Sequence, residues 1–240
     1  MLKVADIRQH FIDELASENF VIDKSGVKTI EMIGATFEAD EPMIFGTPNQ
    51  DYIDRELDWY KSKSLYVKDI PGKTPAIWEA VADSDGKINS NYGYLIWSDE
   101  NYEQYWKVLN ELRANPNSRR AVMIYTRPSI WEEYNKNGMS DFICTNAVQY
   151  MIRDDTLIAV VQMRSNDSWA GYRNDWSWQD HVVKLLAAAL GIDNTKIIWH
   201  VGNLHLYQKQ FYLADHYAKT NEPVISLKDY KEKYPESKWI

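Results

Sequence analysis

The chain has 240 residues, of which 45% are hydrophobic and 26% charged, the composition of an ordinary soluble globular protein. This length suffices for one well-buried domain, and no composition shift divides the chain, so we expect a single domain over residues 1–240. The formal net charge of −8 argues against a protein that coats nucleic acid, because such surfaces need clustered Lys and Arg. An anionic ligand must therefore be held by a local basic pocket.

The cellular compartment follows from cysteine usage and from the absence of apolar runs. The one cysteine cannot form an intrachain disulfide, which fits a reducing environment. No apolar run approaches the ~18 residues that a membrane-spanning helix needs, and the first residues are too charged for a signal peptide. We expect a cytoplasmic protein without a membrane partner.

Apolar spacing and turn residues predict the elements of the first half of the chain. In order, we expect a helix over 2–19, strands within 20–37, a helix over 51–60, turns over 71–93, and a helix over 99–114 that Ser98 or Asp99 opens. Glu56 lies among apolar neighbours near the end of the second helix.

The second half of the chain adds more strands. We expect a strand over 121–125, a polar loop over 128–141, a hairpin of strands 145–152 and 156–163, a helix over 175–190 that ends at Gly191, a strand over 197–201, and a last helix from 205 to 217. Hairpin strands mixed with separate helices indicate an α+β domain with one large sheet.

Cys144 is the first candidate for chemistry. A lone cysteine is more often a small buried hydrophobe, but this one lies where a polar loop meets a strand. If the hairpin turns at Asp154-Asp155, residues 144 and 164 come close at its open end. The Arg164 guanidinium would then favour the reactive thiolate form of Cys144.

Three further side chains could hold an anion. Arg119 and Arg120 follow Ser118, and Ser165 follows Arg164. An arginine pair is often only a solvated strand entrance, but guanidinium groups also bind phosphate through paired hydrogen bonds. Together with Ser165, these arginines supply what a nucleoside monophosphate requires.

These residues form a set with a familiar order and spacing, which resembles the thymidylate synthase superfamily from about Val21 to the last helix. The resemblance is carried by Ser118-Arg119-Arg120, Cys144, Gln149, Arg164-Ser165-Asn166-Asp167, Gly171, Asp175 and Gly202-Asn203-Leu204-His205-Leu206-Tyr207. It implies a thymidylate-synthase-like fold, in which helices pack on one side of a large mixed sheet and the chain dimerises through that sheet.

Within the superfamily, the stretches 23–31, 60–65 and 134–142 resemble the deoxycytidylate hydroxymethylases of T-even-type bacteriophages. Two positions depart from the synthase pattern: Thr145 replaces a histidine, and Asp175 replaces the asparagine that reads uracil. A carboxamide matches the acceptor and donor of uracil, whereas a carboxylate accepts two bonds. Asp175 therefore suits a cytosine whose amino group and protonated ring nitrogen both donate.

The resemblance also implies roles for individual residues. Cys144 would attack ring carbon 6 as the nucleophile, Glu56 would move protons as general acid/base, and Tyr92 would lie near the nucleophile. For the substrate dCMP and the one-carbon donor 5,10-methylenetetrahydrofolate, the implied binding residues are Lys24, Arg119, Arg120, Arg164, Ser165, Asp167, His205 and Tyr207 for the nucleotide, and Trp78, Asp167 and Gly171 for the folate. Arg119 and Arg120 would reach the phosphate of the other subunit of a homodimer.

Other functions stay open on sequence alone. The same fold could transfer a methyl group to dCMP, act on dUMP, or bind a nucleotide without catalysis. The five histidines are scattered, and no His/Cys spacing fits zinc, so we expect no metal. A larger nucleotide-synthesis assembly is a further candidate partner of the dimer.

Overall fold

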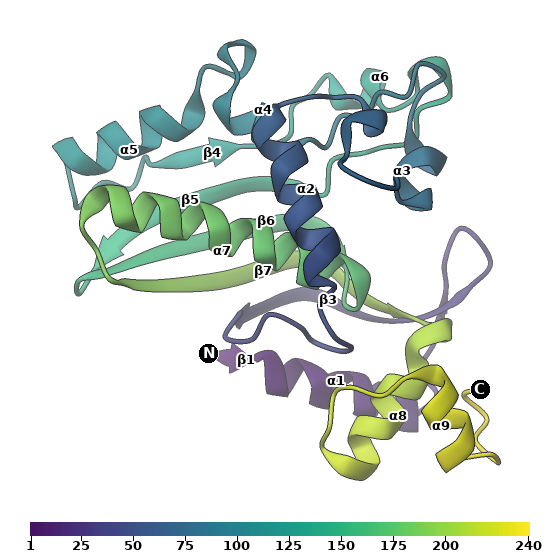
Figure 1. The fold of residues 1–240 in the computed structure, drawn as a ribbon. Coiled ribbons are helices and arrows are strands. Elements are labelled where there is room, and N and C mark those ends of the chain that lie inside the picture. Colours follow the sequence, from purple (N-terminus) through teal and green to yellow (C-terminus); the bar gives the residue numbers. More distant parts are fainter. The chain divides into compact units, whose positions relative to one another are not determined.

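The computed structural model describes residues 1–240, and Figure 1 labels its main elements. The strands are β1 (Leu2–Lys3), β2 (Val21–Ile22), β3 (Lys28–Glu38), β4 (Val122–Ile124), β5 (Thr145–Arg153), β6 (Thr156–Asp167) and β7 (Asn194–Tyr207). The α-helices are α1 (Val4–Ala16), α2 (Gln50–Ser62), α3 (Ala76–Val81), α4 (Tyr92–Trp97), α5 (Gln104–Ala114), α6 (Ile130–Glu133), α7 (Ala170–Leu190), α8 (Phe211–Thr220) and α9 (Leu227–Lys233). Short 3₁₀ turns cover Val67–Asp69, Asp99–Asn101, Lys136–Gly138 and Gln208–Gln210.

The strands form one seven-stranded sheet in the order β1-β3-β7-β6-β5-β4, with β2 paired to β3. β1 runs parallel to β3, whereas the β2–β3, β3–β7, β4–β5 and β5–β6 pairs are antiparallel. The predicted α+β class with a mixed sheet is therefore confirmed. No helix is both long and apolar enough to cross a lipid bilayer.

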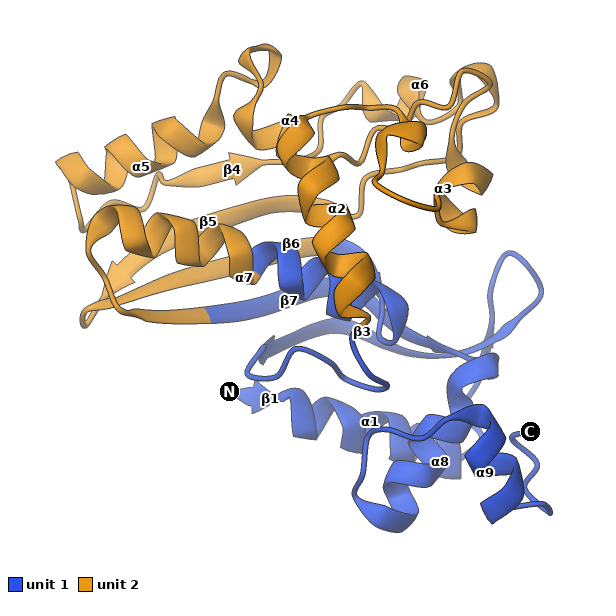
Figure 2. Cartoon of the chain, viewed as in Figure 1, with its two compact units in different colours: residues 1–48, 164–179, 197–240 blue, residues 49–163, 180–196 orange.

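The chain forms two compact units, which Figure 2 distinguishes by colour. Unit 1 comprises residues 1–48, 164–179 and 197–240, and unit 2 comprises residues 49–163 and 180–196. β6, α7 and β7 each run from one unit into the other. The organisation as a single domain stays a prediction.

In unit 1, α1 packs between β3 and α8. Its apolar stripe buries Val4, Ile7 and Phe11 completely, and the Phe11 ring lies 6.0 Å from the ring of Phe45. This spacing of three and four residues is that of an amphipathic helix with one face in the core. α8 contributes the fully buried Phe211 from its first turn.

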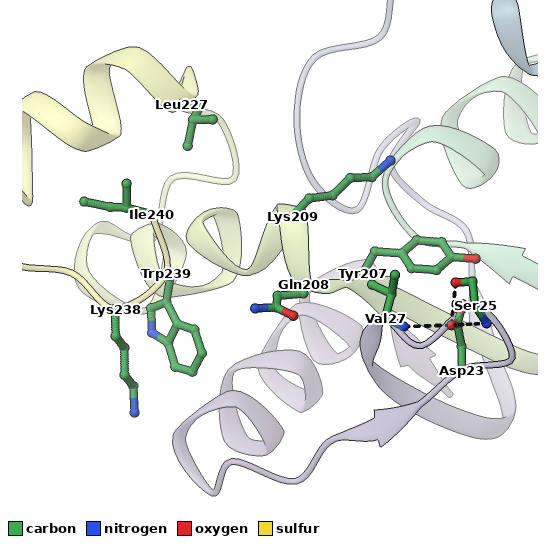
Figure 3. A pocket seen from close by; sticks show the side chains of 10 residues that line it. All are labelled: Asp23, Ser25, Val27, Tyr207, Gln208, Lys209, Leu227, Lys238, Trp239 and Ile240. Atoms are coloured by element: carbon green, nitrogen blue, oxygen red, sulfur yellow. Dashed lines mark hydrogen bonds between the residues drawn. The ribbon is translucent and has the colours of Figure 1, made fainter.

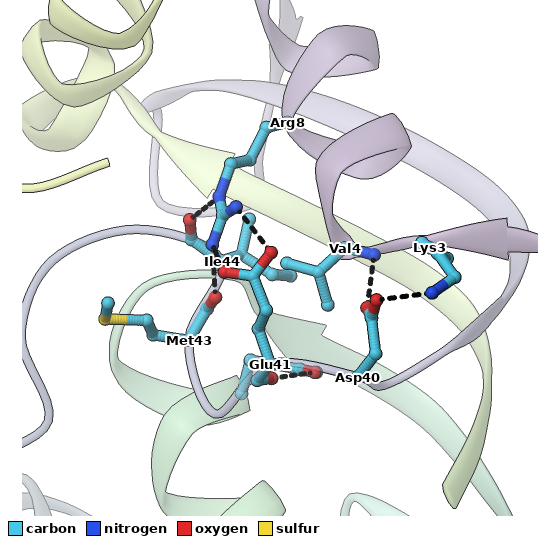
Figure 4. Close-up of polar contacts among 8 residues, drawn as sticks. Lys3, Val4, Arg8, Asp40, Glu41, Met43 and Ile44 are labelled. Carbon is cyan, nitrogen blue, oxygen red and sulfur yellow. Dashed lines mark hydrogen bonds and ion pairs between the residues drawn. The ribbon is translucent and has the colours of Figure 1, made fainter. Parts of the chain in front are cut away.

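A buried arginine fixes the loop that follows β3 (Figure 4). Arg8 is 3% exposed, and its guanidinium donates to the carbonyl oxygens of Met43 and Ile44 at 2.8 and 2.6 Å. Two further bonds of 2.9 and 2.6 Å reach the carboxylate of Glu41. The five-donor fork of arginine suits such a site, because each buried donor needs an acceptor.

In unit 2, α2 and α4 approach each other at Gly93. A Cβ atom at this position would lie 1.9 Å from the carbonyl oxygen of Tyr60, so only glycine permits the contact. Next to it, the rings of Tyr60 and Tyr92 stack at 5.5 Å. α5 covers β4 and β5 with the buried side chains of Val108, Leu109 and Leu112.

The hairpin of β5 and β6 follows the prediction closely. Asp154 and Asp155 have φ values of 48° and 53°, the pair of positive angles that a two-residue type I′ turn requires. Thr145 pairs with Met163, the residue before Arg164, at the open end. The C′ role of Gly191 is also confirmed by its φ of 71° directly after α7.

Other predicted boundaries were wrong. The expected helix from 205 to 217 begins only at Phe211, because His205 and Tyr207 belong to β7, which extends far beyond the predicted 197–201. α7 begins at Ala170 rather than at 175, α5 begins at Gln104 because Ser98 caps a separate 3₁₀ turn, and α9 was not predicted. In β7 the buried side chains change from a spacing of two to three between Val201 and Leu204, which resembles helical periodicity.

Replacing Arg8 by leucine tests its role in unit 1. The substitution leaves the Glu41 carboxylate and two carbonyl groups without their donor, so we expect the free energy of unfolding to fall by about 2–4 kcal/mol. Urea unfolding measures this. As a control, Lys3→Met removes only the exposed ion pair with Asp40, which should cost under about 1 kcal/mol. Equal losses in the two variants would contradict the assignment.

Candidate active site

Glu56 is a carboxylate in the interior of unit 2. It lies in the middle of α2, which Asn49 caps by accepting a bond from the Tyr52 backbone N–H at 3.2 Å. Its side chain is 6% exposed, and burial raises the pKa of Glu56 to about 7. Hydrogen bonds from Tyr52, Trp78 and Tyr60 oppose this shift. A carboxyl group with a pKa near 7 can both take and give a proton at neutral pH.

The Tyr52 hydroxyl lies between Glu56 and Trp78. It donates to Oε1 of Glu56 at 2.5 Å and accepts the indole N–H of Trp78 at 2.8 Å. Trp78 is half-buried in α3. Sequence reasoning missed Tyr52, although a tyrosine four residues before a glutamate on a helix indicates such a pair.

Tyr92 connects the α2–α4 contact with the residue that follows Cys144. Thr145 is fully buried and donates to the Tyr92 hydroxyl at 3.1 Å. Cys144 is half-buried directly before β5, with its Sγ 3.8 Å from the carbonyl oxygen of Phe142. The threonine that replaces the histidine of the synthases therefore positions Tyr92.

The arginine pair lies ahead of β4 with both side chains exposed. Arg120 forms an ion pair of 3.2 Å with Glu111 while its side chain is 81% exposed. Ser118 also donates to Glu111, at 2.5 Å. The chain thus presents the Arg119 and Arg120 guanidinium groups outward from unit 2.

In unit 1, Asp175 accepts a hydrogen bond from the side-chain amide of Asn166 at 2.7 Å. Gly171 lies beside this pair, because a Cβ atom there would be 3.0 Å from Nδ2 of Asn166. The helix expected to begin at Asp175 begins five residues earlier, so Asp175 lies within α7. Asn166 is among the residues that carry the resemblance but had no predicted role, and only a structure places its amide on the carboxylate.

Asp167 is the last residue of β6 and lies shortly before α7. Its Oδ1 accepts the backbone N–H of Trp169 at 2.8 Å, the bond of an Asx-turn. Burial raises the pKa of Asp167, while the N–H groups of Trp169 and Ala170 and the charge of His205 oppose the shift.

The other predicted nucleotide-binding residues of unit 1 lie on β6, β7 and the β2–β3 turn. Tyr207 faces a cavity of about 670 Å³ together with Asp23, Ser25 and Lys209 (Figure 3). Lys24 stands between these two turn residues, and Asp23 holds the turn by accepting three bonds from Ser25 and Val27. The ring of His205 contacts that of Tyr207 at 4.9 Å, and its Nδ1 lies 3.1 Å from Oδ1 of Asn203.

Arg164 and Ser165 occupy the last residues of β6, in the part of that strand that belongs to unit 1. The backbone of Arg164 lies against Gly202 of β7, where a Cβ atom would meet its carbonyl oxygen at 2.9 Å. Glycine at 202 thus permits the close approach of the two strands. Ser165 is half-buried.

The structure therefore divides the predicted residues between the units. Unit 2 holds four predicted site residues, Glu56, Trp78, Tyr92 and Cys144, together with the arginine pair. Unit 1 holds the others, Lys24, Arg164, Ser165, Asp167, Gly171, Asp175, His205 and Tyr207. No cluster of three or more His, Cys, Asp or Glu side chains offers a metal site.

Replacing Glu56 by glutamine tests its desolvation. The folded chain keeps the Glu56 proton between pH 4.5 and about 7, where the unfolded chain has released it, so this carboxyl lowers stability as pH rises through that window. We expect Glu56→Gln to be more stable than the native chain by about 3 kcal/mol at pH 8, with little difference near pH 4.

Chemical unfolding at both pH values measures the difference. Glu79→Gln, an exposed change on α3, is the control and should leave the pH dependence unaltered. A glutamine variant no more stable than the native chain at pH 8 would contradict the burial of an ionisable group at position 56.

Comparison with known proteins adds the family. The profile described as Thymidylate synthase matches residues 16–234. Proteins named deoxycytidylate 5-hydroxymethyltransferase from Enterobacteria phages T4 and T6 are each 58% identical, covering 97% and 96% of this chain and 98% and 96% of their own lengths. A thymidylate synthase of Fusobacterium nucleatum is 31% identical over 61% of this chain and 50% of its own. The chain belongs to the thymidylate synthase family.

Proposed function

We propose that the chain is a deoxycytidylate 5-hydroxymethyltransferase, which converts dCMP, 5,10-methylenetetrahydrofolate and water into 5-hydroxymethyl-dCMP and tetrahydrofolate. The observation that carries this proposal is the carboxylate of Asp175, fixed by the Asn166 amide at 2.7 Å. The 58% identity with the phage enzymes over nearly the whole chain supports it.

Asp175 would select the base. After addition at ring carbon 6, the cytosine ring carries a 4-amino donor and a protonated nitrogen 3. A carboxylate accepts both bonds, so it stabilises the activated adduct more than the resting base. Uracil would place an acceptor oxygen against the same carboxylate, and two acceptors repel each other.

Cys144 would begin the reaction as a thiolate. Its sulfur bonds to ring carbon 6, the 5,6 double bond supplies an electron pair, and carbon 5 becomes nucleophilic. The Thr145–Tyr92 bond supports this assignment, because it holds the Tyr92 hydroxyl beside the chain segment of the nucleophile. Loss of the sulfur at the end restores the aromatic ring.

Glu56 would move the protons. Carbon 5 must lose one proton after it has bonded to the one-carbon unit, and a carboxylate with a pKa of about 7 accepts a proton readily at neutral pH. The same group can then return a proton or polarise the water that adds to the exocyclic methylene. Its burial supports a catalytic role, since an unpaired buried carboxyl costs stability.

The folate would supply the one-carbon unit at the oxidation level of formaldehyde, as co-substrates of this family do. Trp78, a half-buried residue of unit 2, would offer its indole ring to the flat ring of the folate. In unit 1 we assign Asp167 and Gly171 to the folate as well. The packing of Gly171 against Asn166 supplies a further reason for glycine there.

Lys24, Arg164 and Ser165 would bind the phosphate, and His205 and Tyr207 the sugar hydroxyl. We assign Arg119 and Arg120 to the phosphate of a second copy in a homodimer, which their outward presentation supports. Ile33 on β3 and Ile124 on β4 are 71% and 58% exposed, as expected of strands that another copy would cover.

The setting follows from the product. A hydroxymethylated cytosine nucleotide is a precursor for modified DNA, so we place the enzyme in the cytoplasm of a bacterial cell infected by a phage. There it would work beside other enzymes of nucleotide synthesis, with which it could form a larger assembly.

Product analysis by mass spectrometry tests the proposal, with dCMP, dUMP and CMP supplied in parallel. We expect 5-hydroxymethyl-dCMP and tetrahydrofolate from dCMP, and a loss of at least about 10³-fold for Cys144→Ala because no other group forms the covalent adduct. A methyl product with dihydrofolate would establish a methyltransferase instead. Full activity of the alanine variant would contradict the role of Cys144, and no product from any of the three nucleotides with the native chain would leave only nucleotide binding.

Asp175→Asn tests the choice of base. The amide turns a two-acceptor group into one acceptor and one donor, so we expect kcat/KM for dCMP to fall by about 10²–10³-fold relative to dUMP. Competition between the two nucleotides in one assay measures the ratio. Asp180→Asn, which changes a carboxylate paired with Lys184 on the same helix, is the matched control. An unchanged dCMP/dUMP ratio in the Asp175 variant would contradict the role of this carboxylate.

A further inference from the structure

Tyr52 forms a chain of hydrogen bonds with the two unit 2 residues that flank it. Its hydroxyl donates to Oε1 of Glu56 at 2.5 Å, and the Trp78 indole donates to that hydroxyl at 2.8 Å. The Trp78 N–H fills one acceptor position of the hydroxyl oxygen, and the ionised Glu56 carboxylate can only accept, so the hydroxyl proton points at Glu56. The direction of the chain is therefore fixed.

We propose that Tyr52 is a positioning residue for Glu56, which holds Oε1 of the carboxylate and so fixes the orientation in which Glu56 exchanges protons during the reaction. This inference rests on the proposed acid/base role of Glu56. It adds a residue that has no role in the chemistry described so far, and it explains why Trp78 faces α2.

The surroundings of Tyr52 hold it rigidly. Its backbone N–H bonds to the Asn49 cap, and the guanidinium of Arg55 lies over its ring at 5.6 Å. Arg55 is itself bound to the carbonyl oxygens of Pro71 and Lys73 at 3.0 and 2.9 Å. A side chain fixed at its backbone, ring and hydroxyl can orient a neighbour with little entropy cost.

The groups that face Glu56 come from three helices. Tyr52 and Tyr60 lie on α2 itself, Trp78 comes from α3, and Tyr92 of α4 stacks on Tyr60. The charge of Arg55 acts on Tyr52 rather than on the carboxyl. Burial therefore competes with hydrogen bonds alone, and removal of the Tyr52 hydroxyl leaves burial less opposed, so the pKa of Glu56 should rise.

Tyr52→Phe tests the inference, because it removes one oxygen and keeps the ring under Arg55. We expect kcat for dCMP to fall about 10- to 100-fold near neutral pH, the scale of a lost hydrogen bond to a charged group, with KM for dCMP within about twofold. The acid limb of the pH–kcat profile should move to higher pH. Thermal unfolding confirms that the variant is folded.

Tyr230→Phe is the matched control, since it also removes a tyrosine hydroxyl that donates to a carboxylate, that of Asp215. This pair lies between α8 and α9 of unit 1, whereas Glu56 belongs to unit 2. Its loss can lower stability, but the acid limb of the profile should keep its position. An equal shift in both variants would overturn the positioning role.

Glu56→Gln separates this inference from the proposed function. If the glutamine variant keeps native activity, Glu56 is not the acid/base residue, and the positioning role of Tyr52 fails with it. If it is inactive while Tyr52→Phe shows native kcat and an unmoved pH profile, the role of Glu56 stands and that of Tyr52 is wrong. We expect the double variant Tyr52→Phe/Glu56→Gln to lose no more activity than Glu56→Gln alone, because the two residues act as one unit.

Discussion

The contact between α2 and α4 at Gly93 is the constraint on which the reactive part of unit 2 depends. A side chain at this position would collide with the backbone of Tyr60, so the two helices can meet only because residue 93 has no Cβ. The contact stacks Tyr92 on Tyr60, which in turn faces Glu56. Thr145 then ties Tyr92 to the segment of Cys144. One backbone contact thus orders two helices and the start of β5.

Burial of Glu56 both raises the pKa of this carboxyl and lowers the stability of the fold when it is ionised. An ionised carboxyl in the interior destabilises the fold, and the hydrogen bonds from its neighbours offset only part of that cost. The result is a group that changes protonation near neutral pH, which a solvated helix glutamate does not. The burial that lowers the stability of unit 2 at this position also raises the pKa of Glu56 into the range that an acid/base residue needs.

Sequence reasoning named most of the residues that we assign to the chemistry but placed some of them on the wrong elements. The hairpin around Asp154-Asp155 and the end of α7 at Gly191 are encoded locally, by turn residues that tolerate positive φ. His205 and Tyr207 were assigned to a helix but lie on β7, whose buried positions change their spacing after Val201. Residues that act through one another, such as Tyr52 on Glu56, become visible only when side chains meet.

In the proposed function, the choice of base by Asp175 would also depend on Asn166, which contacts the carboxylate and not the base. Its amide donates to one carboxylate oxygen of Asp175, which fixes the plane in which that carboxylate meets a ligand. The same donor would bind the oxygen of an amide at position 175 and turn its NH₂ group toward the base. Such a group suits the oxygen 4 of uracil and opposes the amino group of cytosine. In the proposed function, Asn166 would therefore set the orientation of the side chain at position 175, and the carboxylate or amide there would set which pyrimidine matches it.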